Sequence, residues 1–443
     1  MNDLTKGTPW KKILLFALPI LGSSLIQQLY STVDLIFVGR FIGKEAAAAV
    51  GSSDLLVTLL VGLFTGISVG SSVVAGQAFG SGDKKRLHRL IQNVFSFGML
   101  GSAILLLLGQ LLAPTLLHLI NAPEEIMDMA IVYLRIYFLC IFSLVLYNLG
   151  SGIVRAIGDS VSAMRYQIIG GFTNVVADFL FIYLFHWGVA GAALATFSSQ
   201  TLAAIMTLRY LTRLDREVVL RLREFTFQWN VITKVLKIGI PSGVQSMIMT
   251  FSNILVQSVI NGYGVDTIAA FVSYFKVELF LWYPLVALGQ ALVTYTAQNV
   301  GAGEQKRLRQ GLMTSLLMGV VISFGIAGIL MALAKPVFGL FNTDAHVVEE
   351  AISIAKITFP FYIFYMLQEN FAASLKGYGN ALSPMVISIA CICFARISFL
   401  YLFTAIFGTI QSVAAVYPIS WALSSFFMFL AYLFEKRKNS FSR

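Results

Sequence analysis

The sequence predicts an all-α membrane protein that crosses the bilayer twelve times. Three observations support this fold class. Of the 443 residues, 58% are hydrophobic and only 12% are charged, whereas a soluble protein carries about 25% charged residues. The apolar residues form long stretches, and a helix of about 20 residues crosses a bilayer. The two halves of the chain also repeat the same motifs.

We expect twelve membrane-spanning helices with short connections. The first stretch is longer than the apolar core of a signal peptide and no small-residue cleavage site follows it, so we expect it to remain as a transmembrane helix. The predicted spans are residues 13–38, 48–76, 90–113, 129–152, 166–186, 190–211, 238–262, 268–298, 311–333, 350–373, 384–405 and 412–434.

One connection is long and charged, from Arg209 to Lys237 between the sixth and seventh spans. It is the natural boundary between two halves. The sequence therefore predicts an N-terminal lobe of six helices at 1–212, a cytoplasmic linker at 213–237 and a C-terminal lobe of six helices at 238–443.

The basic residues predict the orientation in the membrane. With the N-terminus in the cytoplasm, most of the 31 Lys and Arg residues lie on the cytoplasmic side, and only Arg40, Lys44 and Lys335 lie outside. Cytoplasmic loops carry such an excess. We therefore expect a multi-pass protein of the plasma or inner membrane with both termini in the cytoplasm. The net charge of +10 then reflects this topology, and we expect no nucleic-acid partner because no soluble domain collects the basic residues.

Several function classes are disfavoured by what the sequence contains. The three Cys residues lie in apolar spans and the four His residues are scattered, so neither a disulfide framework nor metal-ligand spacing is present. There is no phosphate-binding G-x-x-x-x-G-K-[ST] motif and no pairing of nucleophile with base. We expect a protein that is not an enzyme and that has no cofactor.

An internal repeat relates the two halves. The motif Q-x-x-G-x-G-x-x-K-R-L begins at Gln77 and again at Gln298, and Arg155-x-x-Gly158 recurs at the same offset as Lys376-x-x-Gly379. Because each half has an even number of spans, both have the same orientation. Parallel repeats of this kind are typical of secondary transporters.

Four oxygen-bearing side chains in the first lobe predict an ion site. Asp34 lies in the first span, where an aspartate costs about 3 kcal/mol on insertion scales and marks an ion or substrate path. Asn174 and Asp178 share one face of the fifth span, and Thr196 lies at the same outer depth in the sixth. Asp34 near a helix end can also reach the headgroups, and Asn174 and Thr196 can serve as interhelical packing contacts. Two such carboxylates can hold a proton or, with the other oxygens, Na⁺.

The second lobe does not copy these groups. The positions equivalent to Asn174 and Asp178 are Ala395 and Phe399. Glu278 either pairs with Arg396 or lines a cavity for a cationic substrate, and Glu369 near the cytoplasmic edge suits a structural role. The candidates for contact with substrate or cavity, across both lobes, are Gln27, Tyr30, Gln245, Lys276, Glu278, Glu369 and Arg396.

The chain resembles the multidrug and toxic compound extrusion (MATE) transporters of the bacterial NorM and DinF kind. The resemblance rests on LPILGSSLIQQLYSTVDLIFVGRFIG in the first span, the repeated Q-x-x-G-x-G loops, and RAIGD and KGYGN after the fourth and tenth spans. It implies twelve helices in two six-helix lobes forming a V, a monomer, and an ion site at Asp34, Asn174, Asp178 and Thr196. Some relatives use acids in helices seven and ten instead. Here span seven has no acid, only Gln245 and Gln257, and Glu369 is an approximate match in span ten.

These observations predict an antiporter that exports organic, often cationic and lipophilic, compounds in exchange for H⁺ or Na⁺. Asp34 and Asp178 would take up H⁺, or share Na⁺ with Asn174 and Thr196. A flippase for lipid-linked sugars is the alternative, and it would need extra spans and a more cationic cavity. A passive channel or scaffold would be insensitive to neutralisation of Asp34 and Asp178.

Overall fold

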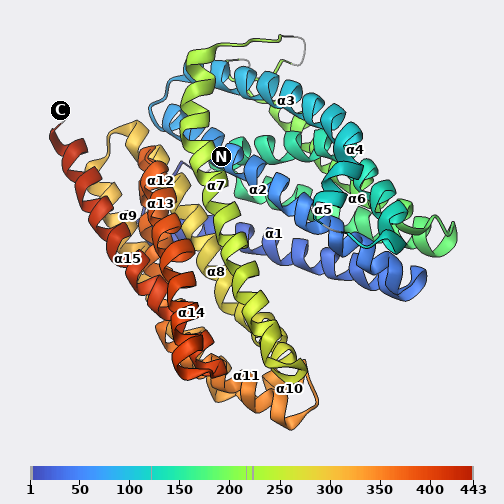
Figure 1. The fold of residues 1–443 in the computed structure, drawn as a ribbon. Helices are drawn as coiled ribbons and strands as arrows, with labels where there is room; N and C mark the ends of the chain where they lie inside the picture. The colour runs from blue at the N-terminus through green and yellow to red at the C-terminus, as the bar shows by residue number, and fades with distance from the viewer. Residues whose placement is uncertain (1–2, 121, 216, 222–223, 442–443) are drawn as a thin grey trace. The chain divides into compact units, whose positions relative to one another are not determined.

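The computed structural model describes residues 3–120, 122–215, 217–221 and 224–441, and these residues form helices joined by turns (Figure 1). No strand occurs in the described part of the chain. The all-α membrane fold predicted from composition is therefore confirmed.

The helices of the first half follow the predicted spans. They are α1 (Pro9–Phe37), α2 (Lys44–Gly80), α3 (Lys84–Leu119), α4 (Glu124–Ala156), α5 (Ser160–Asp178) and α6 (Gly188–Leu211). Two short π-helical segments extend this set, η1 (Val38–Ile42) after α1 and η2 (Phe179–Leu184) after α5.

The second half contains more breaks. Its helices are α7 (Trp229–Ile260), α8 (Val265–Ala302), α9 (Gln305–Ala332), α10 (Ala334–Gly339), α11 (Ala345–Thr358), α12 (Tyr362–Tyr378), α13 (Leu382–Ser388), α14 (Arg396–Phe407) and α15 (Ile410–Phe441). The short segments η3 (Asn261–Tyr263), η4 (Phe359–Phe361) and η5 (Ile389–Ala395) connect some of them.

Eleven helices in the described chain are long and apolar enough to cross a membrane. The predicted span at 350–373 is the twelfth, and it is divided by the 3₁₀ turn η4 into α11 and α12. Pro360 explains the break, because proline has no N–H and disfavours helical geometry in the residue before it. The spans at 166–186 and 384–405 each combine an α-helix with a π-helical segment.

The described helices belong to two compact units. One consists mainly of Leu18–Gly243, and the other of Leu4–Ala17 and Val244–Arg443. The division falls inside α1 and inside α7. Each of these helices therefore begins in one unit and ends in the other.

In the first unit α4 packs against α2, α3 and α6. The first half of α7 belongs to this unit and meets α2 through glycines spaced four apart on both helices. A methyl group at Gly66 would collide with the backbone of Gly243, and one at Gly239 would lie 2.8 Å from the Cα of Ile67. Small residues at this spacing allow membrane helices to approach closely.

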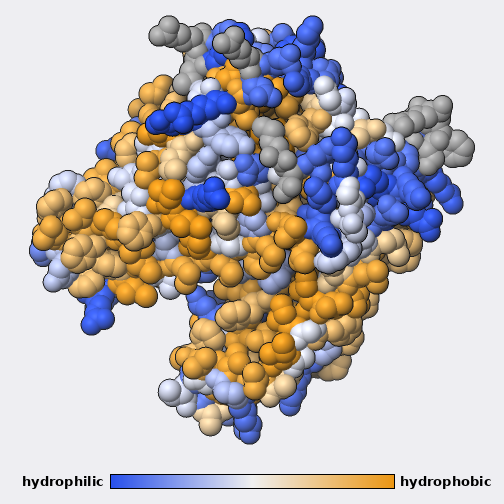
Figure 2. Space-filling view, turned by 180° about the vertical axis from the view of Figure 1, so that it is seen from behind, coloured by the Kyte–Doolittle hydropathy of each residue, from blue (hydrophilic) through white to orange (hydrophobic). Residues whose placement is uncertain are grey.

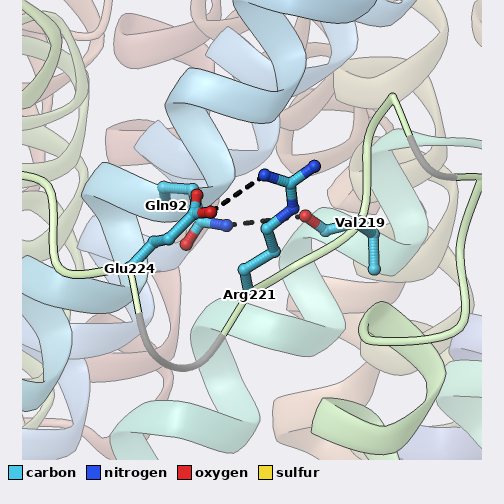
Figure 3. Close-up of polar contacts among 4 residues, drawn as sticks. All are labelled: Gln92, Val219, Arg221 and Glu224. Atoms are coloured by element: carbon cyan, nitrogen blue, oxygen red, sulfur yellow. Dashed lines mark hydrogen bonds and ion pairs between the residues drawn. The ribbon is translucent and has the colours of Figure 1, made fainter.

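The segment before α7 is fastened to α3. The Gln92 amide lies against the backbone at Val219 and Arg221, and Arg221 forms a 2.9 Å ion pair with Glu224 (Figure 3). Farther along, the backbone N–H of Thr226 donates to Ser96 Oγ at 3.1 Å. Residues 216 and 222–223 of the predicted linker lie outside the described part. The described linker residues are thus bound to the first unit.

In the second unit α8 and α12 pack against each other, and α12 also packs against α15. The N-terminal residues belong here: Arg307 donates to the carbonyl oxygens of Gly7 (2.9 Å) and Leu4 (3.0 Å). The Leu4 N–H in turn donates to Gln298 of the repeated loop motif at 3.0 Å. The start of the chain is thereby tied to the loop between α8 and α9.

Large apolar side chains cover much of the surface (Figure 2). On α3, for example, Leu107 and Leu111 are 63% and 76% exposed. Continuous apolar surface of this kind costs free energy in water and none in lipid. The exposed surface therefore fits a bilayer.

Replacing Gly239 with Ala should destabilise the protein. The added methyl group would lie 2.8 Å from the Cα of Ile67, so the two helix backbones must separate, at a cost of about 1–3 kcal/mol. Gly51→Ala is the matched control, because a methyl group there meets nothing within 4 Å. Thermal unfolding of the purified protein in detergent measures both. Equal melting temperatures for the two variants would contradict the close contact.

Asp159 should stabilise the start of α5 in a pH-dependent way. Partial burial acts to raise the pKa of Asp159, but hydrogen bonds from Ser162 N, Ser162 Oγ and Tyr210 outweigh it and lower the pKa. A lowered folded-state pKa gives stability that is present above the unfolded-state pKa and lost as pH falls through the folded-state value. Asp159→Ala should cost about 1 kcal/mol at neutral pH.

Melting curves of wild type and Asp159→Ala across acidic and neutral pH test this expectation. The difference in melting temperature should shrink as the pH falls. Asp159→Asn keeps a capping oxygen and should lose less than Asp159→Ala. A difference that does not change with pH would rule out the charge of Asp159 as the source.

Candidate functional site

The acid pair of the first unit lies where α1 and α5 end. Asp34 is in the last turn of α1, just before the π-helical η1, and Asp178 is the last residue of α5, just before η2. Single π-helical turns inside α-helices occur frequently at functional sites. Both carboxylates therefore stand beside irregular backbone.

The carboxyl groups of Asp34 and Asp178 lie close enough to act on each other through charge and to share a proton. Asp178 is completely buried, and neither of its oxygens receives a hydrogen bond from the donor groups of the described residues. Two adjacent carboxylates repel each other, so a proton shared between them or a bound cation stabilises the pair. This arrangement is chemically suited to holding a positive charge.

Asn174 lies one turn before Asp178 and is 1% exposed. Both polar atoms of its amide are buried and have no hydrogen-bond partner in the described chain. Unsatisfied buried polar groups are rare and costly. Asn174 thus supplies a free oxygen next to the acid pair, on the face where the sequence predicts it.

Thr196 lies on α6 and is half-buried. Its hydroxyl donates to its own helix at the Ala192 carbonyl, at 3.4 Å, and its carbonyl is 3.9 Å from the Cys140 sulfur. A donating hydroxyl keeps lone pairs with which to accept another group. No described hydrogen bond joins Thr196 to Asp34 or Asp178.

Tyr30 extends the polar region from the acid pair. Gln167 donates to its hydroxyl at 3.3 Å, and the Gln200 side chain is a second partner. A methyl group at Gly171 would lie 2.9 Å from the Tyr30 ring, so this glycine makes room for the tyrosine. Tyr30 precedes Asp34 by one helical turn on the same face.

Gln167, Ser199 and Gln200 were not among the site residues predicted from the sequence. Gln167, Gly171, Asn174 and Asp178 follow the 4-3-4 spacing of one helix face, and this spacing is the signal that would have added Gln167 to the predicted pair Asn174 and Asp178. Ser199 is 1% exposed and its hydroxyl has no hydrogen-bond partner in the described residues. It lies one turn after Thr196 on α6, where Ser-Ser-Gln interrupts an apolar helix.

Gln27 and Gln245 have different surroundings. Gln27 is exposed, two turns before Asp34 on the same side of α1. Gln245 is buried on α7 and donates to Ser388 Oγ at 2.9 Å. Gln245 therefore ties two helices of the second unit together.

Glu278 of α8 accepts two tyrosine hydroxyls at one oxygen. Tyr274 and Tyr362 donate to Oε1 at 3.0 and 3.1 Å. Lys276 is exposed and two residues away, so it lies on another face of the helix. Glu278 is half-buried, with a hydrogen-bonded carboxylate.

Arg396 is 3% exposed at the start of α14. It donates through Nε to Ser420 Oγ (2.9 Å) and through Nη1 to Asn253 Oδ1 (3.2 Å), and its guanidinium lies 4.9 Å from the Tyr417 ring centre. Glu278 and Arg396 act on each other electrostatically, but the described residues contain no direct ion pair between them.

Glu369 of α12 is half-buried and packs against Gly289 of α8, where a methyl group would lie 2.8 Å from its Oε1. Lys376, two turns later on α12, is its charged neighbour. The described structure thus places Glu369 beside a basic residue, and both Glu369 and Glu278 act through charge on Tyr365 of α12.

The comparisons with known proteins agree with this fold. The MatE family model matches residues 19–180 and again 241–402, so both halves of the chain match one family and the internal repeat is a repeat of that unit. The two matched ranges cover most of the chain.

Among relatives, the chain is 26% identical to the "Probable multidrug resistance protein YoeA" of Bacillus subtilis, over 99% of this chain and 96% of that protein. It is 28% identical to "Probable multidrug resistance protein YpnP" of the same organism, over 98% and 97%. A third relative, the Thermotoga maritima "Probable multidrug resistance protein NorM", is 25% identical over 87% and 84%.

Solved structures have the same fold. The structure described as "Crystal structure of MATE in complex with MaL6" has a TM-score of 0.92 at 23% identity, covering 99% of this chain and 98% of that one. The "Outward-facing conformation of a multidrug resistance MATE family transporter of the MOP superfamily" has a TM-score of 0.89 at 23% identity, covering 99% and 97%. With a matching family model over most of its length, this multi-pass membrane protein is a transporter rather than an enzyme and belongs to the MatE family.

Proposed function

We propose that this protein is an antiporter that exports organic, cationic and lipophilic compounds across the cell membrane in exchange for an inward-moving cation. The observation that carries the proposal is the contact between Asp34 and Asp178, with Asp178 fully buried. The names of the relatives support a drug as the transported compound. The excess of basic residues in the cytoplasmic segments supports cytoplasmic termini.

The proton is the coupling ion that this geometry favours. Two carboxyl groups in direct contact can share one proton without further ligands, whereas a hard metal cation is held by several oxygen ligands at once. Asn174 adds one amide oxygen, and the Thr196 hydroxyl, which donates to Ala192, keeps lone pairs that could accept a metal cation. Na⁺ held by these four residues is the second candidate.

Binding of the cation changes the charge of the pair, and this change couples transport to the ion gradient. When both acids are ionised, the two carboxylates repel each other and attract a cation. With the proton bound, the repulsion is gone and the helices carrying the acids can pack differently. A ligand shifts such an equilibrium only by its differential affinity for the two conformations. The acid pair supplies that difference.

Asp34→Asn and Asp178→Asn should each abolish the response of transport to the ion gradient. Coupling free energies of 1–3 kcal/mol correspond to rate or affinity changes of about 5–150-fold, so we expect gradient-driven efflux to fall by roughly tenfold or more. Purified protein in liposomes, loaded with a fluorescent lipophilic cation, gives the efflux rate under an imposed pH gradient and, separately, an imposed Na⁺ gradient.

Asp128→Asn is the matched control, because Asp128 is an exposed acid on α4 and its neutralisation should leave efflux unchanged. An effect of the Na⁺ gradient alone would replace the proton with Na⁺ as the coupling ion. Full efflux in both acid variants would refute coupling at Asp34 and Asp178. Failure of any cationic dye to move in wild type would favour the flippase or scaffold alternatives.

A further inference from the structure

The second unit holds a buried cation of its own. Arg396 directly follows the π-helical η5, and Asp178 directly precedes the π-helical η2 of the first unit. The equivalent span of each half therefore carries a buried charged residue beside a π-helical segment, and the two charges have opposite sign. In the first unit that residue is an acid that needs a cation, and in the second it is a cation.

The surroundings of Arg396 form a site for a guanidinium group. Ser420 Oγ and Asn253 Oδ1 accept two of its N–H groups from α15 and α7, and the Tyr417 ring covers its face. Aromatic faces and side-chain oxygens are the groups that bind a desolvated guanidinium. All three partners lie within the second unit.

Glu278 is the acid that acts on Arg396 through charge. Its Oε1 accepts the hydroxyls of Tyr274 and Tyr362, and Tyr362 packs against Trp421 with ring centres 5.0 Å apart. Trp421 in turn packs against Tyr417, with ring centres 5.9 Å apart. The acid and the arginine are therefore the two charged ends of one buried aromatic cluster.

The other titratable groups around this cluster are four tyrosines, two lysines and Glu369. Tyr274, Tyr362, Tyr365 and Tyr417 face it from α8, α12 and α15, and they carry no charge as phenols. Lys276 is exposed on another face of α8. Glu369 and Lys376 lie farther along α12, where each is the other's charged neighbour, and Glu369 also acts on Tyr365. Arg396 is the basic group that acts on Glu278.

We propose that Arg396 is a built-in counter-cation for Glu278, held in a guanidinium site of Asn253, Ser420 and Tyr417, so that Glu278 binds no coupling ion. An arginine stays protonated in proteins, and charges interact strongly in a low-dielectric interior. A second cation at Glu278 would meet repulsion from Arg396. This inference rests on the proposed function only where it assigns coupling to the first unit alone, and the guanidinium site itself is tested without transport.

Chemical rescue tests the site. Arg396→Ala should lower the melting temperature of the purified full-length protein, because Glu278 loses its counter-charge and a cavity opens. Guanidinium chloride at millimolar concentration should restore most of that loss by entering the vacated site. Urea has the same shape without the charge and should not. Wild type and Arg396→Lys, which keep a cation, should not respond to guanidinium.

The rescue should also depend on Glu278. In the double variant Arg396→Ala/Glu278→Gln no counter-charge is required, so guanidinium should give no rise in melting temperature. Three results would overturn the proposal. These are a failure of guanidinium to rescue folded Arg396→Ala, rescue of that variant by urea as well, and equal rescue of the double variant by guanidinium. If Arg396→Ala does not fold, Arg396→Gln takes its place. The double variant Arg396→Gln/Glu278→Gln should then melt at a higher temperature than Arg396→Gln alone. A lower melting temperature in the double variant would overturn the proposal.

The outcome is separable from that of the proposed function. Loss of gradient-driven efflux in the Asp34 and Asp178 variants concerns the first unit and leaves the melting experiment unaffected. Rescue with wild-type-like ion coupling supports both proposals. Rescue in a protein that moves no cationic dye supports the guanidinium site and removes only the assignment of transport.

Discussion

A charge inside a bilayer must be compensated, and this constraint governs the polar groups of both units. Moving a carboxylate out of water costs several kcal/mol even after relaxation. The first unit places two acids, Asp34 and Asp178, in contact, and we propose that a cation from outside compensates them. The second unit surrounds Glu278 with phenol hydroxyls and sets an arginine at the far side of the same cluster. The same physical requirement is thus met in two ways.

The two halves match one family model, yet their polar residues differ. A repeat preserves the helix lengths and loop motifs that build the scaffold, such as the motifs at Gln77 and Gln298. Charged residues inside the spans are under a separate constraint, because each must be matched by its own neighbours. The halves accordingly share the repeated loop motifs and differ at the buried charges. A family resemblance therefore describes the scaffold better than it describes the site.

Irregular backbone accompanies the charged side chains. Asp178 and Arg396 adjoin the π-helical segments η2 and η5, and Asp34 lies in the helical turn before η1. Extra residues in a helical turn rotate the side chains that follow and loosen the hydrogen-bond ladder. Elsewhere the helices approach closely through glycine, as at Gly239 against α2. Close glycine contacts and π-helical segments thus occupy different parts of the first unit, with the acids beside the π-helical segments.

The sequence by itself determined the fold class, the spans and the repeat, because these depend on local hydrophobicity and on residue spacing. It also identified Asp34, Asn174 and Asp178 as unusual, since an acid or amide in an apolar span is visible without coordinates. The 3₁₀ turn at Phe359–Phe361 was readable in principle from Pro360, yet its effect on the tenth span required the structure.

Only the tertiary structure decided which groups meet. It showed that Tyr30 bonds to Gln167, that the Thr196 hydroxyl is directed at Ala192, and that Glu278 bonds to tyrosines rather than directly to Arg396. It also assigned the start of α1 to the second unit and the start of α7 to the first. These facts depend on how helices distant in sequence are rotated and packed. Periodicity gives the face of a helix that is polar, whereas packing between helices selects the partner which that face meets.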